Sequence, residues 1–156
     1  MPTQLDLGQQ AIIRRPGGRG RPVMLATLDV PFEESAVAFA VDSAVELGQG
    51  LIVANFTERS PLPLSIILGY DDLPYPPALA ASLRHPAELA RSLGVNVVRI
   101  RVKSFYPIQA MVETISEQDP GLFVFGADRR RVRRLRYRRA VRAIRSRSSV
   151  LVWLPE

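Results

Sequence analysis

The fold of this chain is decided by residues 122–155, which read LFVFGADRRRVRRLRYRRAVRAIRSRSSVLVWLP. Four apolar residues stand before Gly126, and a short run that is apolar throughout is typical of a strand buried on both faces. Residues 134–146 show helical spacing, and apolar residues from 150 to 154 predict a second buried strand. The expected apolar stripe of the helix consists of Leu135, Val141 and Ile144. The stretch therefore predicts a strand, a loop, a helix and a parallel strand.

The residues before this stretch show the same alternation of strands and helices. Apolar runs predict strands at 23–28, 51–56 and 97–102. Helical spacing predicts helices at 33–48, 78–93 and 107–119. Pro86 is expected to kink or split the second of these helices. The order of elements predicts an α/β domain in which helices cover both faces of a five-stranded parallel sheet.

Two further segments have the composition of loops. Residues 1–21 end in a stretch with three glycines and a proline, which predicts a flexible N-terminal lead-in. The domain itself is then expected to span residues 22–156, an ordinary length for one domain. Residues 57–77 carry five prolines, which predicts a long loop of the kind that often forms a lid or a contact surface.

Composition excludes several classes of site. The chain has no cysteine, so it has no disulfide, no thiolate metal site and no cysteine nucleophile. No apolar run approaches the roughly 20 residues that span a bilayer, and residues 1–10 lack the pattern of a signal peptide. We therefore expect a cytoplasmic protein without a membrane partner.

Charge is distributed unevenly along the chain. The net charge is +6, but residues 129–147 hold eleven arginines and no acidic residue. The remaining residues carry 10 basic and 15 acidic side chains, a net charge of −5. All basic residues except Lys103 are arginines, whose planar head groups favour two-point contacts with anions.

Candidate catalytic residues are few. His85 is the single histidine, and the pattern provides it with no serine, cysteine or metal-ligand partner. Asp71 and Asp72 are oxygen donors for a cation, but a solvated turn is the preferred interpretation. We expect neither an enzyme nor a metal site.

Three features together resemble the universal stress protein family. They are Asp29 directly after the first strand, the apolar strand that ends in Gly126, and the last helix running into a short apolar strand. The resemblance covers about residues 22–155 and implies strand order 3-2-1-4-5, an adenine nucleotide alpha hydrolase-like sheet. In that order the carboxyl ends of strands one and four are adjacent at the topological switch point, the usual ligand crevice. Asp29 and Gly126 are then expected to be neighbours there. The resemblance implies that Asp29 contacts the ligand, and the alternative is that it only forms the turn after the strand.

The resemblance also implies an altered nucleotide site. Nucleotide-binding members carry glycine, two residues, glycine, nine residues, glycine and then serine or threonine. Here Gly126 matches, whereas the later motif positions hold Arg129, Arg139 and Ala140. Glycines at such positions let backbone N–H groups approach phosphates, and arginine side chains would crowd that space. Phe56 is expected to fill the base pocket, so we expect no cofactor, with ATP or another nucleotide as the disfavoured alternative.

Three interpretations of the element 129–147 stay open. It forms a solvated or dimer-facing surface, a site for a small anion or phosphate ligand, or a surface for nucleic acid or another polyanion. Four arginines fall on one side of the expected helix, and the first three of them are candidate anion ligands. The four are Arg134, Arg138, Arg142 and Arg145. Arg129 and Arg139, from the motif, are candidate ligand residues of the crevice.

The resemblance implies a role and a partner. Family members usually form dimers, often through the last strand. The dimer edge would consist here of Val150, Val152 and Trp153. Without a partner, such an edge strand would be an exposed template for pairing with another strand. We therefore expect a homodimeric, non-enzymatic regulatory or stress-response protein that does not bind ATP in the family's usual manner. The alternative is an anion-, nucleotide- or nucleic-acid-binding module that uses residues 129–147.

Overall fold

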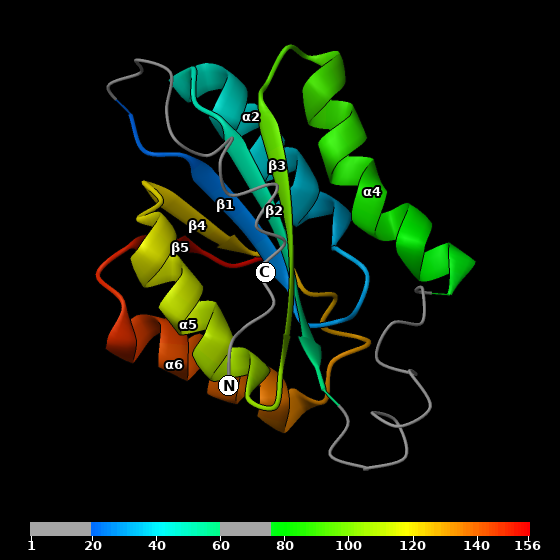
Figure 1. Cartoon of the computed structure of the whole chain (residues 1–156), viewed down its shortest axis with the longest axis vertical. Helices are drawn as coiled ribbons and strands as arrows, with labels where there is room; N and C mark the ends of the chain where they lie inside the picture. Colours follow the sequence, from blue (N-terminus) through cyan, green and yellow to red (C-terminus); the bar gives the residue numbers. More distant parts are fainter. Residues whose placement is uncertain (1–19, 60–75) are drawn as a thin grey trace.

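The computed structural model describes residues 20–59 and 76–156, in which strands and helices alternate (Figure 1). The elements are β1 (Val23–Thr27), α2 (Glu34–Leu47), β2 (Leu51–Glu58), α4 (Pro77–Ser92), β3 (Val97–Ser104), α5 (Pro107–Gln118), β4 (Leu122–Phe125), α6 (Arg134–Arg147) and β5 (Leu151–Trp153). Most of the expected lead-in and most of the proline-rich loop, with Asp71 and Asp72, lie outside the described residues.

The five strands form one parallel sheet in the order β3-β2-β1-β4-β5. The predicted order is confirmed. The chain moves outward from β1 to β3 and then returns to place β4 on the other side of β1. The carboxyl ends of β1 and β4 are therefore adjacent at the point where the strand order reverses, where open α/β sheets usually bind ligands.

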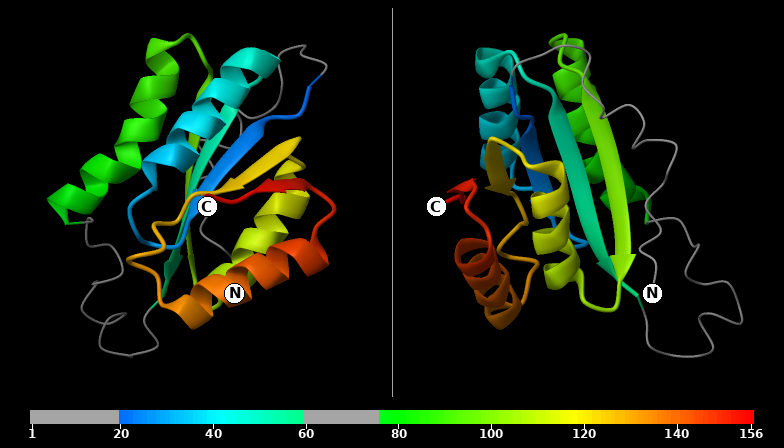
Figure 2. Two further views of the ribbon diagram at one scale, coloured as in Figure 1. Left: turned by 180° about the vertical axis from the view of Figure 1, so that it is seen from behind. Right: turned by 60° about the vertical axis from the view of Figure 1, so that its left-hand side comes forward.

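Helices α2 and α4 cover one face of the sheet, and α5 and α6 cover the other (Figure 2). Successive residues of β1 point to opposite faces: Val23 and Leu25 join the core under α2 and α4, while Met24 and Ala26 join the core under α5 and α6. All residues of β1 and β4 are buried, which explains why their sequences are apolar without alternation.

Pro86 does not split α4. The helix is continuous from Pro77 to Ser92, and Pro86 lies on its buried side with Leu83, Ala87 and Ala90. A proline inside a helix removes one backbone hydrogen bond. Burial of this apolar side against the sheet stabilises the helix sufficiently to keep it continuous.

The buried side of α6 differs from the predicted stripe. Tyr137, Ala140 and Ile144 are buried, whereas Leu135 is 61% exposed. The inclusion of Leu135 was therefore wrong. The ring of Tyr137 packs 5.3 Å from the ring of Phe125, so the larger aromatic side chain occupies the core position of this turn.

Candidate functional site

The turn after β1 is held by side chains at the carboxyl end of the sheet. Asp29 has a left-handed backbone with φ of 55°, which aspartate tolerates better than most residues. Its N–H donates to Oδ1 of Asn55 at 2.8 Å, and Oγ1 of Thr27 donates to the carbonyl of Val30 at 2.9 Å. Asn55 stands beside Thr27 in the parallel register of β1 and β2. The turn is therefore fixed by the neighbouring strand.

The carboxylate of Asp29 lies in a half-buried environment that disfavours its charge. Burial raises the pKa of Asp29, and the hydrogen bond with Asn55 and the charges of Arg101 and Arg136 oppose that rise only in part. Oδ1 is buried and has no hydrogen-bond partner among residues 20–59 and 76–156. Asp29 therefore retains a free acceptor, which suits its predicted role as a ligand contact.

Sequence reasoning identified Asp29 but missed the polar residues around it. Asn55 is only 6% exposed although it interrupts an apolar strand, and Arg101 stands beside it in register on β3. The signal was present in the sequence: a buried amide inside an apolar run calls for a hydrogen-bond partner. Its partner could be named only once the parallel register was known.

Gly126 is a packing residue. Its N–H donates to the carbonyl of Ala26 at 2.8 Å, and its carbonyl accepts the N–H of Glu33 at 2.9 Å. A Cβ at this position would lie 2.7 Å from Cδ1 of Leu25 and 3.1 Å from Cβ of Ala36. Close approach of β1 and α2 therefore accounts for glycine here without a ligand. The predicted adjacency of the strand ends that carry Asp29 and Gly126 is confirmed by the pairing of β1 with β4.

The loop of residues 126–133, which we call the closed loop, uses carboxylates as internal anions. The N–H of Arg130 donates to Oδ1 of Asp128 at 3.0 Å. The N–H of Arg129 donates to Oε1 of Glu33 at 3.4 Å, across 96 positions of sequence. Two backbone donors of the closed loop are therefore satisfied by carboxylates of the same chain.

The other backbone donors of the closed loop also have protein acceptors. The N–H of Asp128 donates to the carbonyl of Pro31 at 3.0 Å. The N–H groups of Arg131 and Val132 donate to the carbonyl of Asp128 at 3.0 and 3.2 Å. Every backbone N–H from 128 to 132 therefore donates a hydrogen bond to an acceptor within the protein.

The remaining motif positions lie inside α6. Arg139 and Ala140 belong to its second turn, where backbone N–H groups bond to carbonyls of the preceding turn. Ala140 is fully buried in the core. The motif keeps its length along the chain, but these two positions provide no backbone donor for a ligand.

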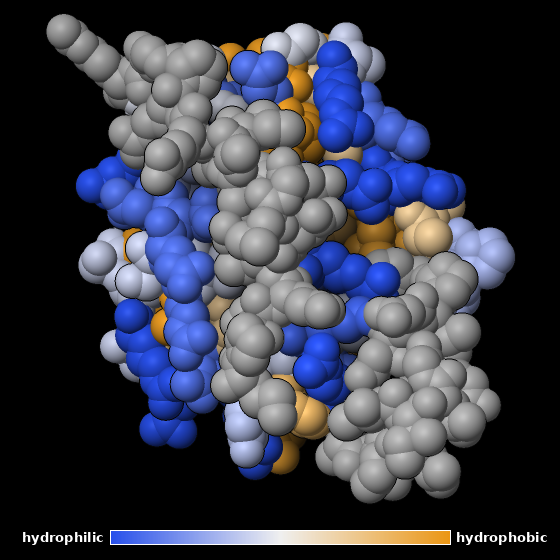
Figure 3. Space-filling model, viewed as in Figure 1, coloured by the Kyte–Doolittle hydropathy of each residue, from blue (hydrophilic) through white to orange (hydrophobic). Residues whose placement is uncertain are grey.

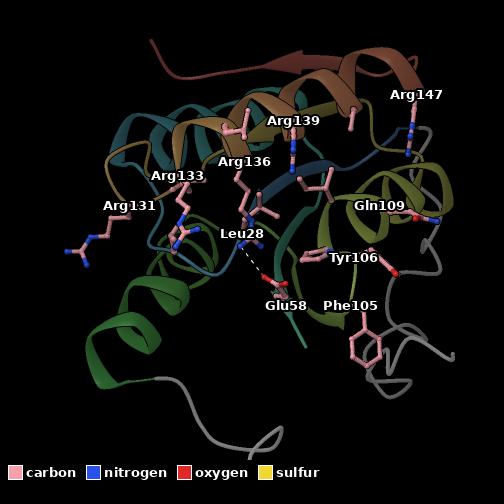
Figure 4. Close-up of a pocket in the computed structure, with 16 residues that line it drawn as sticks. Leu28, Glu58, Phe105, Tyr106, Gln109, Arg131, Arg133, Arg136, Arg139 and Arg147 are labelled. Carbon is pink, nitrogen blue, oxygen red and sulfur yellow. Dashed lines mark hydrogen bonds and ion pairs between the residues drawn. The ribbon is translucent and has the colours of Figure 1, made fainter. Parts of the chain in front are cut away.

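A hollow of about 900 Å³ lies between α6 and the turn from β3 to α5 (Figure 4). The neighbours of Asp29, Leu28 and Val30, contribute to its wall, but Asp29 itself does not. Phe105 and Tyr106 line the side opposite α6, and Tyr106 is 72% exposed. Of the crevice residues predicted from the sequence, Arg139 lines this hollow, and Asp29, Gly126 and Arg129 do not.

Four arginines of α6 and its N-cap line the hollow, and we call them the inner row. They are Arg133, Arg136, Arg139 and Arg147. Glu58 is the acidic residue of the lining, and its Oε2 lies 3.4 Å from Nη1 of Arg136. Within the described parts of the chain, Arg133, Arg139 and Arg147 form no ion pair. The hollow is therefore strongly positive.

Four further arginines lie exposed on α6 outside the hollow, and we call them the outer row. They are Arg134, Arg138, Arg142 and Arg145. The predicted exposed side of the helix is thus confirmed, and none of the four pairs with an acid in residues 20–59 or 76–156. Strongly hydrophilic residues cover the lower left of Figure 3, where α6 lies in Figure 1.

Two other predicted residues take structural positions. The guanidinium of Arg129 lies 4.9 Å from the ring centre of Tyr137, as in a cation–π contact. Phe56 is fully buried in the core under α5 and α6, with Leu28 and Val102. Burial raises the pKa of Tyr137, and the charge of Arg129 opposes that rise.

The last strand is a sheet edge, as predicted. The ring of Trp153 stacks on that of Phe39 at 4.4 Å, so part of its surface is covered within the chain. Val150 and Val152 pack against the core under α5 and α6. Leu151, which sequence reasoning did not single out, is 70% exposed.

His85 is exposed on α4, away from the hollow. The described residues contain no group of three or more potential metal ligands. None of the helices described has the length and apolar character needed to cross a bilayer.

Comparison with known proteins identifies the fold. No family model and no curated protein matches the sequence. A universal stress protein solved in complex with cAMP matches with a TM-score of 0.58 and 20% identity over 89% of this chain and 98% of that chain. The universal stress protein from Archaeoglobus fulgidus matches with a TM-score of 0.60 and 13% identity over 87% and 93%. The Archaeoglobus protein in complex with dAMP matches with a TM-score of 0.54 and 15% identity over 87% and 98%. The chain therefore has the universal stress protein fold.

Proposed function

We propose that this chain is a universal-stress-protein-type domain with a non-enzymatic regulatory or stress-response role, which does not hold ATP in the family's usual manner. The observation that carries the proposal is the closed loop. Its backbone donors from 128 to 132 all have acceptors within the protein, and Asp128 and Glu33 supply two of these. A phosphate would have to displace these acceptors before it could bind there.

The remainder of the nucleotide crevice supports the same conclusion. Phe56 is fully buried in the core cluster that also contains Leu28, the residue before Asp29, so its ring belongs to the core. The third glycine position of the motif, Arg139, has its backbone inside a helix. Asp29 keeps a free acceptor among the described residues, and one carboxylate oxygen is a weak basis for binding a triphosphate.

Isothermal calorimetry with Mg-ATP tests this proposal. The similar structures hold cAMP and dAMP, so both nucleotides belong in the same series. We expect no heat of binding for any of them at millimolar concentration. Binding of Mg-ATP in the micromolar range would overturn the proposal.

A second candidate function is anion binding in the hollow. Three arginines of the inner row have no acid partner among the residues that the structure describes. The hollow also reaches Leu135 and Arg136 in the first turn of α6, where backbone N–H groups lack helical acceptors. Guanidinium groups and a helix N-terminus both favour phosphates and carboxylates.

Pyrophosphate titration followed by backbone NMR tests this candidate. We expect shifts that centre on the first turn of α6 and that are lost in the variant Arg133→Gln with Arg139→Gln. The matched control is Arg84→Gln with Arg91→Gln, which removes two exposed arginines of α4. Equal losses in both variants would show that the effect is general charge and not the hollow.

We propose a homodimer through β5. The support is an edge strand with Leu151 70% exposed, because a free sheet edge readily pairs with another strand. Leu151→Lys places a charge on that edge without disturbing a buried side chain. We expect sedimentation velocity to show a dimer for the wild type and a monomer for the variant; identical sedimentation of the two would contradict the interface.

A further inference from the structure

We propose that the hollow and the outer row of α6 together form a binding surface for single-stranded nucleic acid. The strand's phosphates would follow the arginines of α6, and a base would stack on Tyr106. This inference refines the second candidate function and is independent of whether the closed loop binds ATP.

The charge on α6 is larger than a small anion requires. Seven arginines from 133 to 147 have no acidic partner in the described structure. They are Arg133, Arg134, Arg138, Arg139, Arg142, Arg145 and Arg147. They follow a helix of 14 residues, which is about 21 Å long at 1.5 Å per residue. A single phosphate in the hollow would leave the outer row without a counter-charge. A chain of phosphates that leaves the hollow and crosses over the exposed side of α6 could contact both rows.

The aromatic side of the hollow favours a nucleic acid over other polyanions. Tyr106 is 72% exposed, so most of the surface of its side chain is open to solvent. Phe105 lines the hollow beside it, on the side opposite α6 (Figure 4), and the guanidinium carbon of Arg59 lies 5.9 Å from the centre of its ring. A positive groove with exposed aromatic rings is the arrangement that proteins use to bind single strands, since every base offers a face for stacking. Duplexes hide these faces, so the strand should be single.

Glu58 makes the prediction more specific. It is the acidic residue of the hollow's lining, and its Oε2 lies 3.4 Å from Nη1 of Arg136. Glu58 therefore repels phosphate and also pairs with a guanidinium that could otherwise contact phosphate. Glu58→Gln releases Arg136 without changing the size of the side chain. The variant should therefore bind a single strand more tightly than the wild type.

Fluorescence anisotropy with a labelled single strand of about 16 nucleotides measures the interaction. Affinity should fall steeply between about 50 and 200 mM salt, because each phosphate contact on a single strand contributes about 0.7 to the logarithmic slope. Arg138→Gln with Arg142→Gln should lower that slope by about 1.4 if both arginines contact phosphates. Arg84→Gln with Arg91→Gln on α4 is the matched control and should leave slope and affinity unchanged.

Tyr106 separates base recognition from charge alone. Tyr106→Ala should weaken binding by about 5- to 150-fold, the range expected for loss of one stacked base, and Tyr106→Phe should restore it. Inorganic polyphosphate, at a phosphate concentration equal to that of an unlabelled single strand, should displace the labelled strand from the wild type less well than the unlabelled strand does. From Tyr106→Ala, the two competitors should displace it equally well. Circular dichroism of each variant shows that the fold is retained.

Three outcomes would overturn the inference. They are absence of binding at about 50 mM salt, equal affinity for a duplex and a single strand, and a Tyr106→Ala variant that binds as the wild type does. Binding of Mg-ATP by calorimetry would refute the proposed loss of the usual ATP site and leave this inference intact. Failure to bind the single strand would refute the inference and leave the ATP result unaffected.

Discussion

The closed loop and α6 are adjacent in sequence and both are rich in arginine, yet their ligand-binding groups are occupied differently. In the loop, the backbone donors from 128 to 132 all bond to acceptors of the same chain. On α6 and its N-cap, seven arginine side chains have no acidic partner in residues 20–59 or 76–156. The closed loop therefore satisfies its donors with acceptors of the same chain, whereas the arginines of α6 are available to an external anion.

The difference follows from where each region lies in the sheet. Because β1 and β4 are paired, the loops that follow them run side by side, and Pro31 and Glu33 of the first reach the donors of the second. Helix α6 has no comparable neighbour: it packs its buried side on the core and α5, and residues 129–147 contain no acid. Adjacent loops satisfy backbone groups locally, but a dense row of cations needs charge from elsewhere.

The largest expected effect comes from breaking the close approach that holds the closed loop. Gly126→Ala places a Cβ 2.7 Å from Cδ1 of Leu25, which is fully buried and cannot move into open space. We expect the free energy of unfolding to fall by about 1–3 kcal/mol, the usual cost of overpacking a core. Urea denaturation followed by circular dichroism measures it.

A second substitution tests the cause of that loss. Leu25→Val removes the Cδ1 atom that the new methyl group would meet. In a double-mutant cycle, the double variant should therefore lose less stability than the two single losses added together. Additive losses would show that the loss arises from the other neighbours of the new methyl group, Ala36 and Phe32, and not from Leu25.

The fold was predictable because its signals are local and strong. The apolar runs at 23–28 and 122–125 identify strands that are buried on both faces, and the alternation with helices leaves few topologies. The resemblance then supplied the strand order, which the structure confirms.

The closed loop was not predictable in the same way. Its acceptors include Glu33, which lies 96 positions from Arg129, and no periodicity links the two residues. The resemblance also placed Arg139 at a phosphate-binding position of the family's motif, although the backbone there is helical. The position of Leu135 was missed because Tyr137 occupies the core in its turn, and a hydropathy stripe does not register the apolar ring of tyrosine.

An intermediate effect is expected from removing the internal anions of the closed loop. Glu33→Ala with Asp128→Ala frees the N–H groups of Arg129 and Arg130 from their carboxylates. Pyrophosphate should then bind about tenfold more tightly than to the wild type, as one or two charge-assisted hydrogen bonds become available. Calorimetry with pyrophosphate measures the change.

The control for that variant removes the same charge elsewhere. Glu34→Ala with Glu46→Ala takes two exposed carboxylates from α2 that do not touch the loop. We expect it to change pyrophosphate affinity only slightly. An equal gain in both variants would mean that overall charge, and not release of the loop's backbone, controls binding.

The smallest expected effect concerns Asp29, whose carboxylate is influenced by the charge of Arg136 on α6. Burial raises the pKa of Asp29, so the folded state holds a proton on this carboxyl more tightly than the unfolded state does. The stability that it contributes is fully present below its ordinary pKa of about 4 and is lost as the pH rises through the raised value. Asp29→Asn keeps a residue that tolerates the left-handed backbone and removes the charge.

The Asn variant should therefore be more stable than the wild type at neutral pH, and the difference should disappear as the pH falls below about 4. Denaturation midpoints across that pH range measure it. A variant less stable than the wild type at neutral pH would mean that the attraction of Arg101 and Arg136 outweighs the cost of burial. The Asp29 carboxylate would then be stabilised by charges of the protein itself, as the carboxylates of the closed loop are by its backbone N–H groups. Its free Oδ1 would in that case no longer indicate an open acceptor for a ligand.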